Sequence, residues 1–379
     1  MALDSHLDTP MFFHRESYDF SQRGSFGESG IQVDLPRMIE GGLDGGFWVI
    51  FTPQGPLDEA AYLSARTMAL VRQMSIREMA AKYADSVELA FTADDASRIH
   101  GDGKVAVYQS MENAYPLGED LSLLEVFYTG GLRMIGPVHF RNNQFADSST
   151  DKTEPFGGLS PLGEALVREA NRLGMIVDAS HASDEALRDM MAISTTPVIL
   201  SHSGPDGVYE HARNVPDELL KQVAEAGGVI HINAYGTYLE ELTPTPERKA
   251  ALTELREEFG TDFFSMSEET RQAFRLARGA INQEFPAPRS SFEKYLEHLF
   301  YALELVGSDH VGIGADWDGG GGVDGMEDVA AIPRITRALI DAGYSEDDIE
   351  KVWSGNLLRV MREVEAARNS TLMSPKIIN

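Results

Sequence analysis

Two side chains that commonly bind metal ions, His6 and Asp8, stand two residues apart near the start of the chain, in LDSHLD. Side chains of a β-strand alternate between its faces, so a His-x-Asp pair points both groups to the same side. Such a pair can chelate an ion, but a single pair means little. It predicts a metal site only if distant segments bring further ligands to the same place.

Further candidate ligands occur where other short apolar segments end. In chain order they are Glu112, His139, His181, His202 and Asp316. With His6 included, four of the ten histidines fall at such ends, which scattered surface histidines would seldom do. Each residue alone also has a structural explanation, such as a helix cap for Glu112 or a turn cap for Asp316. The prediction therefore depends on the shared position of these residues.

The available ligand atoms restrict the metal. The chain contains no cysteine, so any metal must be held by nitrogen and oxygen atoms of His, Asp and Glu. Three histidines and two carboxylates suit zinc and also admit Mn, Fe or Co. Five protein ligands are too many for one open catalytic zinc ion. They suit two ions roughly 3.5–4 Å apart that share a bridging carboxylate.

Eight apolar segments rich in β-branched or aromatic residues alternate with segments of helical periodicity. They are ALDSHLD, GGFWVIFT, KVAVYQSMEN, RMIGPVHF, GMIVDASH, TPVILSHS, GGVIHINAY and DHVGIGAD. This alternation predicts parallel strands, and eight such strands close an α/β (β/α)8 TIM barrel. A doubly wound sheet is the alternative, but no glycine-rich phosphate turn follows an early strand. In a barrel the carboxyl ends of all strands meet at one face, so the candidate ligands would converge there.

One stretch interrupts this alternation. Residues 236–291 fall between the seventh and eighth strand segments and are helical, charged and bounded by proline-containing turns. Their apolar content is too thin for a core of their own. We therefore expect residues 1–379 to form one barrel domain, with this helical insertion walling or covering the mouth.

The motifs resemble those of the membrane dipeptidase (renal dipeptidase) family, the M19 metallopeptidases among the amidohydrolase-like barrels. Matching stretches follow the family order over nearly the whole chain, and the most specific are ASHASDEAL, PVILSHSG, HARNVPDELL and GIGADWDG. The chain departs from the family where Asn113 follows Glu112, a position usually held by glycine. It also departs where Phe140 and Arg141 follow His139. Arg141 could add an anion contact, and a solvated loop charge is the competing interpretation.

The resemblance implies how the candidate ligands divide between two zinc ions. His6 and Asp8 would bind one ion, and His181 and His202 would bind the other. Glu112 would bridge the two ions.

The resemblance also implies roles toward the substrate. His139 would help to hold the substrate and its developing oxyanion. Arg213 would grip the C-terminal carboxylate of the substrate, since a guanidinium matches a carboxylate at two points. Asp316 would act as general acid and base. From the residues alone, Arg213 could equally form a salt bridge within its loop.

The function implied by the resemblance is that of a zinc-dependent dipeptidase, a metallo-exopeptidase and hydrolase. It would hydrolyse L-Xaa-D-Xaa or L-Xaa-L-Xaa dipeptides with a hydroxide that bridges two zinc ions. Another binuclear amidohydrolase, such as an N-acyl-amino-acid deacylase or a lactonase, would use the same ligands. A non-catalytic relative that kept the fold would lack ligands, whereas all five are present here.

Composition limits the partners. The formal net charge of −28 disfavours nucleic acid and anionic membranes, and no apolar run is long enough to span a bilayer. We expect a small dipeptide substrate, and the resemblance implies that two copies can pair as a homodimer. The expected compartment is the cytoplasm, or the periplasm or exterior if a leader was removed.

Overall fold

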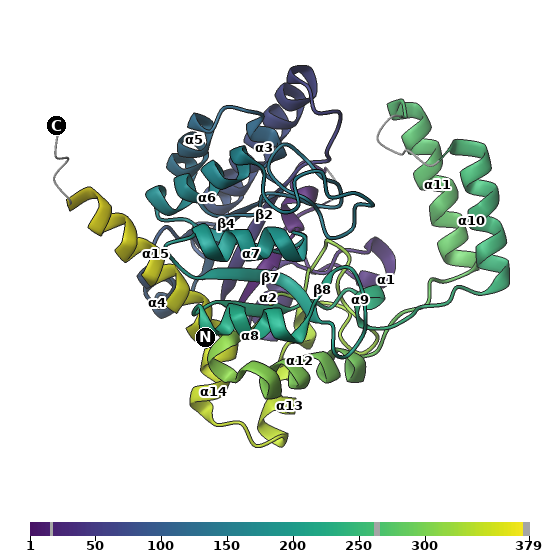
Figure 1. Ribbon diagram of the computed structural model, residues 1–379. Coiled ribbons are helices and arrows are strands. Elements are labelled where there is room, and N and C mark those ends of the chain that lie inside the picture. Colours follow the sequence, from purple (N-terminus) through teal and green to yellow (C-terminus); the bar gives the residue numbers. More distant parts are fainter. Residues whose placement is uncertain (16–17, 261–265, 374–379) are drawn as a thin grey trace.

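The computed structural model describes residues 1–15, 18–260 and 266–373. Its centre is a parallel sheet that curves into a nearly closed barrel, with helices around the outside (Figure 1). All eight predicted strands are present and neighbour one another in chain order: β1 (Leu3–Leu7), β2 (Gly45–Phe51), β4 (Val105–Glu112), β5 (Leu132–Ile135), β6 (Ile176–Asp178), β7 (Val198–Pro205), β9 (Val229–Ile232) and β10 (Val311–Ile313). The predicted (β/α)8 fold class is confirmed.

The barrel closes between its first and last strands. Leu7 forms a parallel bridge with Trp317, and the amide of Asp8 donates a 2.9 Å hydrogen bond to the Trp317 carbonyl. Two short strands that the sequence did not predict add to the sheet, β3 (Val87–Leu89) beside β4 and β8 (Asn214–Val215) beside the end of β7. Strands of two or three residues are too short for a detectable alternation of side chains.

The barrel strands are apolar because both of their faces are covered. All eight residues of β4 are buried, as are all eight of β7. The covering helices are α2 (Leu35–Gly41), α3 (Glu59–Lys82), α4 (Ala93–Gly101), α5 (Ser122–Gly130), α6 (Pro161–Leu173), α7 (Asp184–Ile193), α8 (Asp217–Glu225), α12 (Phe292–Val306), α13 (Pro333–Asp341), α14 (Glu346–Glu350) and α15 (Asn356–Met373). Strands buried on both faces in this way are typical of parallel sheets.

Local signals set the helix ends. The side chain of Ser160 accepts a hydrogen bond from the amide of Gly163 and so caps the start of α6. The same helix ends at Gly174, whose φ of 73° few other residues tolerate. This helix therefore leads directly into β6, as its sequence predicts.

The predicted helical insertion lies between β9 and β10. It begins with α9 (Gly236–Leu239) and continues as α10 (Pro246–Phe259) and α11 (Glu268–Glu284), which form an antiparallel pair that stands away from the barrel (Figure 1). We call α10 and α11 the helical arm. Residues 261–265 of the predicted insertion lie outside the described residues.

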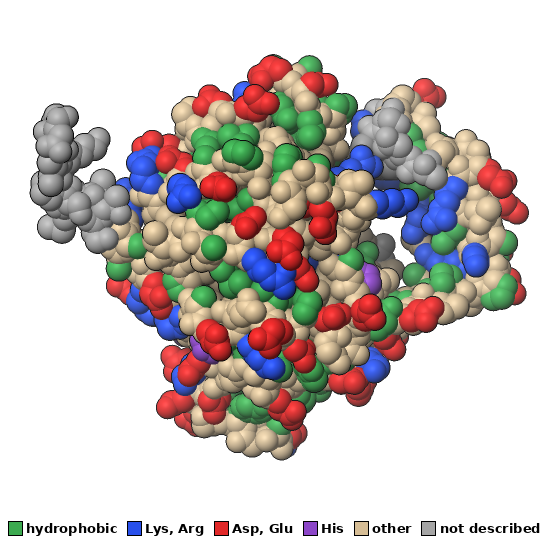
Figure 2. All heavy atoms as spheres, viewed as in Figure 1, with side chains coloured by type: hydrophobic (Ala, Val, Ile, Leu, Met, Phe, Trp, Pro, Cys, Tyr) green, Lys and Arg blue, Asp and Glu red, His purple; other side chains and the backbone are tan. Residues whose placement is uncertain are grey.

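The two faces of the helical arm carry opposite charges. Figure 2 shows Lys and Arg side chains on its face toward the barrel, and Asp and Glu side chains on its outer side. The buried Arg248 of α10 donates hydrogen bonds to the Phe285 carbonyl and, at 2.9 Å, to the Asn282 side chain at the far end of α11. In the part of the chain that the structure describes, no helix is both long and apolar enough to cross a membrane.

Candidate metal centre and substrate pocket

The candidate ligands gather at the carboxyl ends of the barrel strands, as predicted. His6 lies within β1, His202 lies within β7 and Glu112 is the last residue of β4. The prediction that other strands end at His139, His181 and Asp316 is wrong, because β5, β6 and β10 stop earlier and these residues lie in the segments that follow.

Backbone turns bring the loop residues back to the site. His181 has a φ of 71° and Asp316, beyond the end of β10, has a φ of 62°. Such left-handed backbone conformations are uncommon for residues other than glycine and often occur at functional sites. Both residues come three positions after the end of their strand, and their side chains line the cavity.

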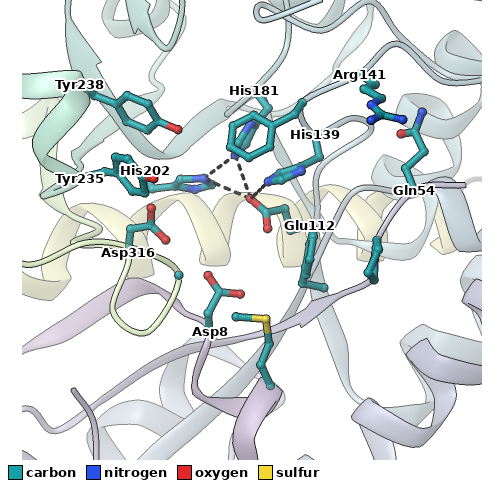
Figure 3. A pocket seen from close by; sticks show the side chains of 15 residues that line it. Asp8, Gln54, Glu112, His139, Arg141, His181, His202, Tyr235, Tyr238 and Asp316 are labelled. Carbon is teal, nitrogen blue, oxygen red and sulfur yellow. Dashed lines mark hydrogen bonds and ion pairs between the residues drawn. The ribbon is translucent and has the colours of Figure 1, made fainter. Parts of the chain in front are cut away.

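The carboxylate of Glu112 is the centre of the cluster (Figure 3). Its Oε1 atom lies near four histidine Nε2 atoms, at 2.9 Å from His181, 3.2 Å from His202, 3.7 Å from His6 and 3.8 Å from His139. The same Nε2 atom of His6 also lies 3.4 Å from Oδ2 of Asp8. The five predicted metal ligands are thus brought together.

The chemistry of this cluster fits bound cations. Ligand atoms of His6, Glu112 and His202 lie within 4.8 Å of one another, and so do those of two further sets, Glu112–His139–His181 and His6–Asp8–Asp316. His6 Nε2 and Asp8 Oδ1 are buried and have no hydrogen-bond partner among the described residues. Buried polar atoms are costly without a partner, and a cation would supply one to nitrogen and oxygen ligands alike.

The electrostatics of the site favour the same interpretation. Burial, with the nearby charge of Arg213, lowers the pKa of His181 well below its ordinary value, and burial likewise lowers that of His202. Both rings are therefore uncharged, which is the form that binds metals. Burial raises the pKa of Glu112 and of Asp316 against the opposing charge of His6. A cation would stabilise these two carboxylates in their charged forms.

Polar partners hold the ligands from behind. Ser201 Oγ lies 2.8 Å from Nδ1 of His202 and donates a 2.6 Å hydrogen bond to Asp178, so the Nε2 atom of the ring faces the cluster. The Asn233 amide donates to the Asp316 carboxylate at 3.4 Å and to the His202 carbonyl at 3.3 Å. Asn233 thus positions an acid of the site.

A cavity of about 360 Å³ opens over the cluster. Its walls include Asp8, Met11, Phe51, Pro53, Gln54, Glu112, His139, Phe140, Arg141, His181, His202, Tyr235, Tyr238, Asp316 and Gly319. Tyr235 and Tyr238 stack at 4.5 Å beside Asp316, whereas Arg141 and Gln54 lie on the opposite side (Figure 3). The sequence reasoning missed both tyrosines and Gln54. All three follow the carboxyl end of a strand, the same position that identified the ligands.

Arg213 is close to the cluster, but its side chain is not among those that line the cavity. It is buried, and it donates a 2.9 Å hydrogen bond to the His202 carbonyl. Its guanidinium lies 5.4 Å from the ring centroid of Tyr238, and its Nε has no hydrogen-bond partner among the described residues. His211 accepts a hydrogen bond from the Arg213 amide and stays apart from the ligands.

Known proteins resemble this chain over nearly its whole length. A dipeptidase, tcpJ of Claviceps purpurea, is 31% identical over 96% of this chain and 76% of its own. The crystal structure of the probable dipeptidase PvdM from Pseudomonas aeruginosa is 32% identical, covers 97% of this chain and 96% of its own, and superposes with a TM-score of 0.82.

A third protein was solved with a ligand. It is a metallopeptidase from Rhodobacter sphaeroides liganded with a phosphinate mimic of the dipeptide L-Ala-D-Ala, and it is 25% identical with a TM-score of 0.75. The alignment covers 96% of this chain and 99% of that one. Residues 1–375 match the membrane dipeptidase family, peptidase family M19. With the barrel and its ligand cluster, this match shows that the chain belongs to the M19 membrane dipeptidase family of metallopeptidases.

Proposed function

We propose that this protein is a zinc-dependent dipeptidase that hydrolyses L-Xaa-D-Xaa or L-Xaa-L-Xaa dipeptides. The observation that supports this proposal most is the position of Glu112, whose one carboxylate oxygen faces histidines from β1 and β7 and from the loops after β5 and β6. A single carboxylate in this position can bridge two cations.

The residues divide between two zinc ions. His6 and Asp8 would hold one ion, His181 and His202 would hold the other, and Glu112 would be shared. Mn, Co or Fe could take the same ligands, since all of these are nitrogen or oxygen atoms. When bound, such ions lower the pKa of a water molecule and polarise the carbonyl of the peptide bond.

Other side chains then act on the substrate. Burial, with the charge of Arg213, lowers the pKa of His139 to about 3, so its ring is neutral and can donate an N–H to a developing oxyanion. Burial raises the pKa of Asp316 above its ordinary value, which suits a group that accepts a proton from water and passes it to the leaving amine. Arg213, whose Nε has no hydrogen-bond partner in the described part of the chain, would bind the C-terminal carboxylate.

The test combines metal content with a substrate panel. Purified protein is expected to contain about two divalent ions per chain, to hydrolyse L-Ala-D-Ala or L-Ala-L-Ala, to lose activity with a chelator and to regain it with zinc. His181→Ala should lose metal and activity. His100→Asn, at an exposed histidine of α4, is the matched control and should lose neither.

Two results would contradict the proposal. Metal-loaded protein that hydrolyses no dipeptide of a broad panel would exclude it. Faster cleavage of N-acetyl-amino acids or lactones than of dipeptides would instead support the alternative amidohydrolase activity.

A further inference from the structure

Arg141 is a positive charge on the cavity wall that the proposed reaction does not use. Its side chain is exposed to the cavity beside Gln54. Among the described residues, no carboxylate lies within ion-pairing distance of it, whereas most exposed arginines on the helices have such a partner. An arginine without an acidic partner in a substrate pocket is well suited to bind an anion.

We propose that this enzyme prefers dipeptides whose N-terminal residue has an acidic side chain, and that Arg141 binds the carboxylate of that side chain. The inference rests on the proposed dipeptidase function and specifies the substrate class of the same site.

The backbone on both sides of Arg141 is held in place. The Phe140 carbonyl accepts a 3.0 Å hydrogen bond from the Thr150 hydroxyl, and the Asn142 amide donates a 3.0 Å hydrogen bond to the Asp151 carboxylate. Neither of these hydrogen bonds involves the side chain of Arg141. A fixed backbone with a free guanidinium can adjust to Asp and Glu side chains of different length.

Gln54, in the loop after β2, forms hydrogen bonds to the same part of the cavity wall. Its Nε2 donates a 2.8 Å hydrogen bond to the Asn142 carbonyl, and its Oε1 accepts a 3.4 Å hydrogen bond from the Asn113 amide. These contacts join the loop after β2 to the loop that contains Arg141. Hydrogen bonds between two loops therefore hold the polar side of the cavity wall in place.

The position of Arg141 determines which end of a dipeptide it meets. Tyr238, which covers Arg213, and Arg141 lie on opposite sides of the ligand cluster (Figure 3). If Arg213 binds the C-terminal carboxylate and the peptide bond lies over Glu112, the N-terminal residue extends toward Arg141. Its side chain is then the part of the substrate that an anion site there would recognise.

The Lys and Arg side chains of the helical arm lie on its face toward the barrel (Figure 2). Burial lowers the pKa of Arg15, and the charge of Arg275 in α11 contributes to this shift. The charge of Arg278, one turn further along α11, acts on Tyr235 of the cavity wall. The whole chain has a net charge of −28 and would repel acidic peptides, whereas the Lys and Arg side chains on this face of the helical arm would attract them.

The experiment compares Glu-Ala with Gln-Ala, which has nearly the same shape but no side-chain charge, and with Ala-Ala. The zinc-loaded enzyme is expected to show a kcat/KM about twofold to fivefold higher for Glu-Ala than for Gln-Ala, the usual effect of one exposed charge pair. In Arg141→Gln this preference should disappear while kcat/KM for Ala-Ala stays unchanged. Arg337→Gln, at an exposed arginine of α13 on the outside of the barrel, is the control and should keep the preference.

Equal kcat/KM for Glu-Ala and Gln-Ala in the unsubstituted enzyme would overturn the inference. So would an Arg141→Gln variant that keeps the preference. A second experiment distinguishes failure of this inference from failure of the proposed dipeptidase function. It measures, by calorimetry, the binding of Glu-Ala and Gln-Ala to the zinc-loaded Asp316→Asn variant. If no dipeptide is hydrolysed, tighter binding of Glu-Ala that depends on Arg141 still supports the inference, and equal binding overturns it.

Discussion

The side-chain oxygen of Asn113 accepts a 2.9 Å hydrogen bond from the side-chain amide of Asn143. The same oxygen accepts a 3.2 Å hydrogen bond from the Tyr115 amide, and Asn113 has a φ of 69°. Asparagine tolerates this conformation better than other residues with a Cβ atom. The residue that departs from the usual glycine thus keeps the turn after Glu112 and also joins it to the loop after β5.

Two substitutions at Asn113 separate these effects. Asn113→Gly keeps the turn but removes the side-chain bonds, and should lower the free energy of unfolding by about 1 kcal/mol. Asn113→Ala also places a Cβ atom without hydrogen bonds at positive φ, so it should cost about 1 kcal/mol more. Urea unfolding measures both. Equal stability of the two variants would show that the backbone turn imposes no strain.

Removal of the Ser201 hydroxyl should weaken metal binding without removing a ligand. If Nε2 of His202 binds a cation, its Nδ1–H is left to donate to Ser201 Oγ, which in turn donates to Asp178. Loss of such a partner typically lowers metal affinity about 10–100-fold. Competition with a chromophoric chelator measures the affinity of Ser201→Ala. Ser308→Ala, outside the site, is the control, and equal affinity in both variants would contradict this role.

Asp316 can serve as an acid–base group or as a metal ligand, and one variant distinguishes the two. Asp316→Asn keeps the shape and the contact with Asn233 but cannot take up a proton. We expect kcat to fall by about 10²–10⁴-fold while KM and metal content stay near those of the unsubstituted enzyme. Loss of one metal ion from this variant, measured by mass spectrometry, would assign Asp316 to the metal instead.

His231 should make the stability depend on pH. It lies inside the barrel with Nδ1 at 3.1 Å from the Leu200 carbonyl, and burial lowers its pKa to about 4. Because its folded-state pKa is below the ordinary value of about 6.5, the unfolded chain binds more protons between these two pH values. The stabilisation is complete above about pH 6.5 and decreases as the pH falls toward 4.

The variant His231→Asn can donate to the same carbonyl but does not titrate. Between pH 6.5 and 4.5 the unsubstituted protein should lose on the order of 2 kcal/mol more stability than the variant, since one pKa unit corresponds to about 1.4 kcal/mol. Thermal unfolding of chelator-treated protein at several pH values measures the difference. Parallel curves for the two proteins would contradict the role of His231.

Some of the structure follows from local pattern. The eight strands were predictable because each is an apolar segment bounded by helical periodicity, and the helix ends at Ser160 and Gly174 have ordinary capping residues. The convergence of His6, Glu112 and His202 was predictable as well, because parallel strands of a barrel end at the same face. The prediction that Asp8 belongs to the first strand is wrong, because Asp8 lies just beyond β1 with φ −82° and ψ 4°, so strand alternation alone does not explain its approach to His6.

Other features depend on contacts between distant segments. The short strands β3 and β8 form only because β4 and β7 offer edges beside them. The position of Arg213 behind His202, the pair of tyrosines beside Asp316 and the place of Arg141 across the cavity result from how the loops fold back over the barrel. The orientation of the helical arm, with its basic side toward the barrel, likewise could not be predicted from local sequence pattern.

The amino-acid sequence by itself determined the barrel and the set of candidate metal ligands, because strand alternation and strand order are properties of neighbouring residues. Only the tertiary structure decided which side chains line the cavity and which lie behind its wall. That choice depends on loop conformations, such as the left-handed turns at His181 and Asp316, that packing against the rest of the molecule stabilises.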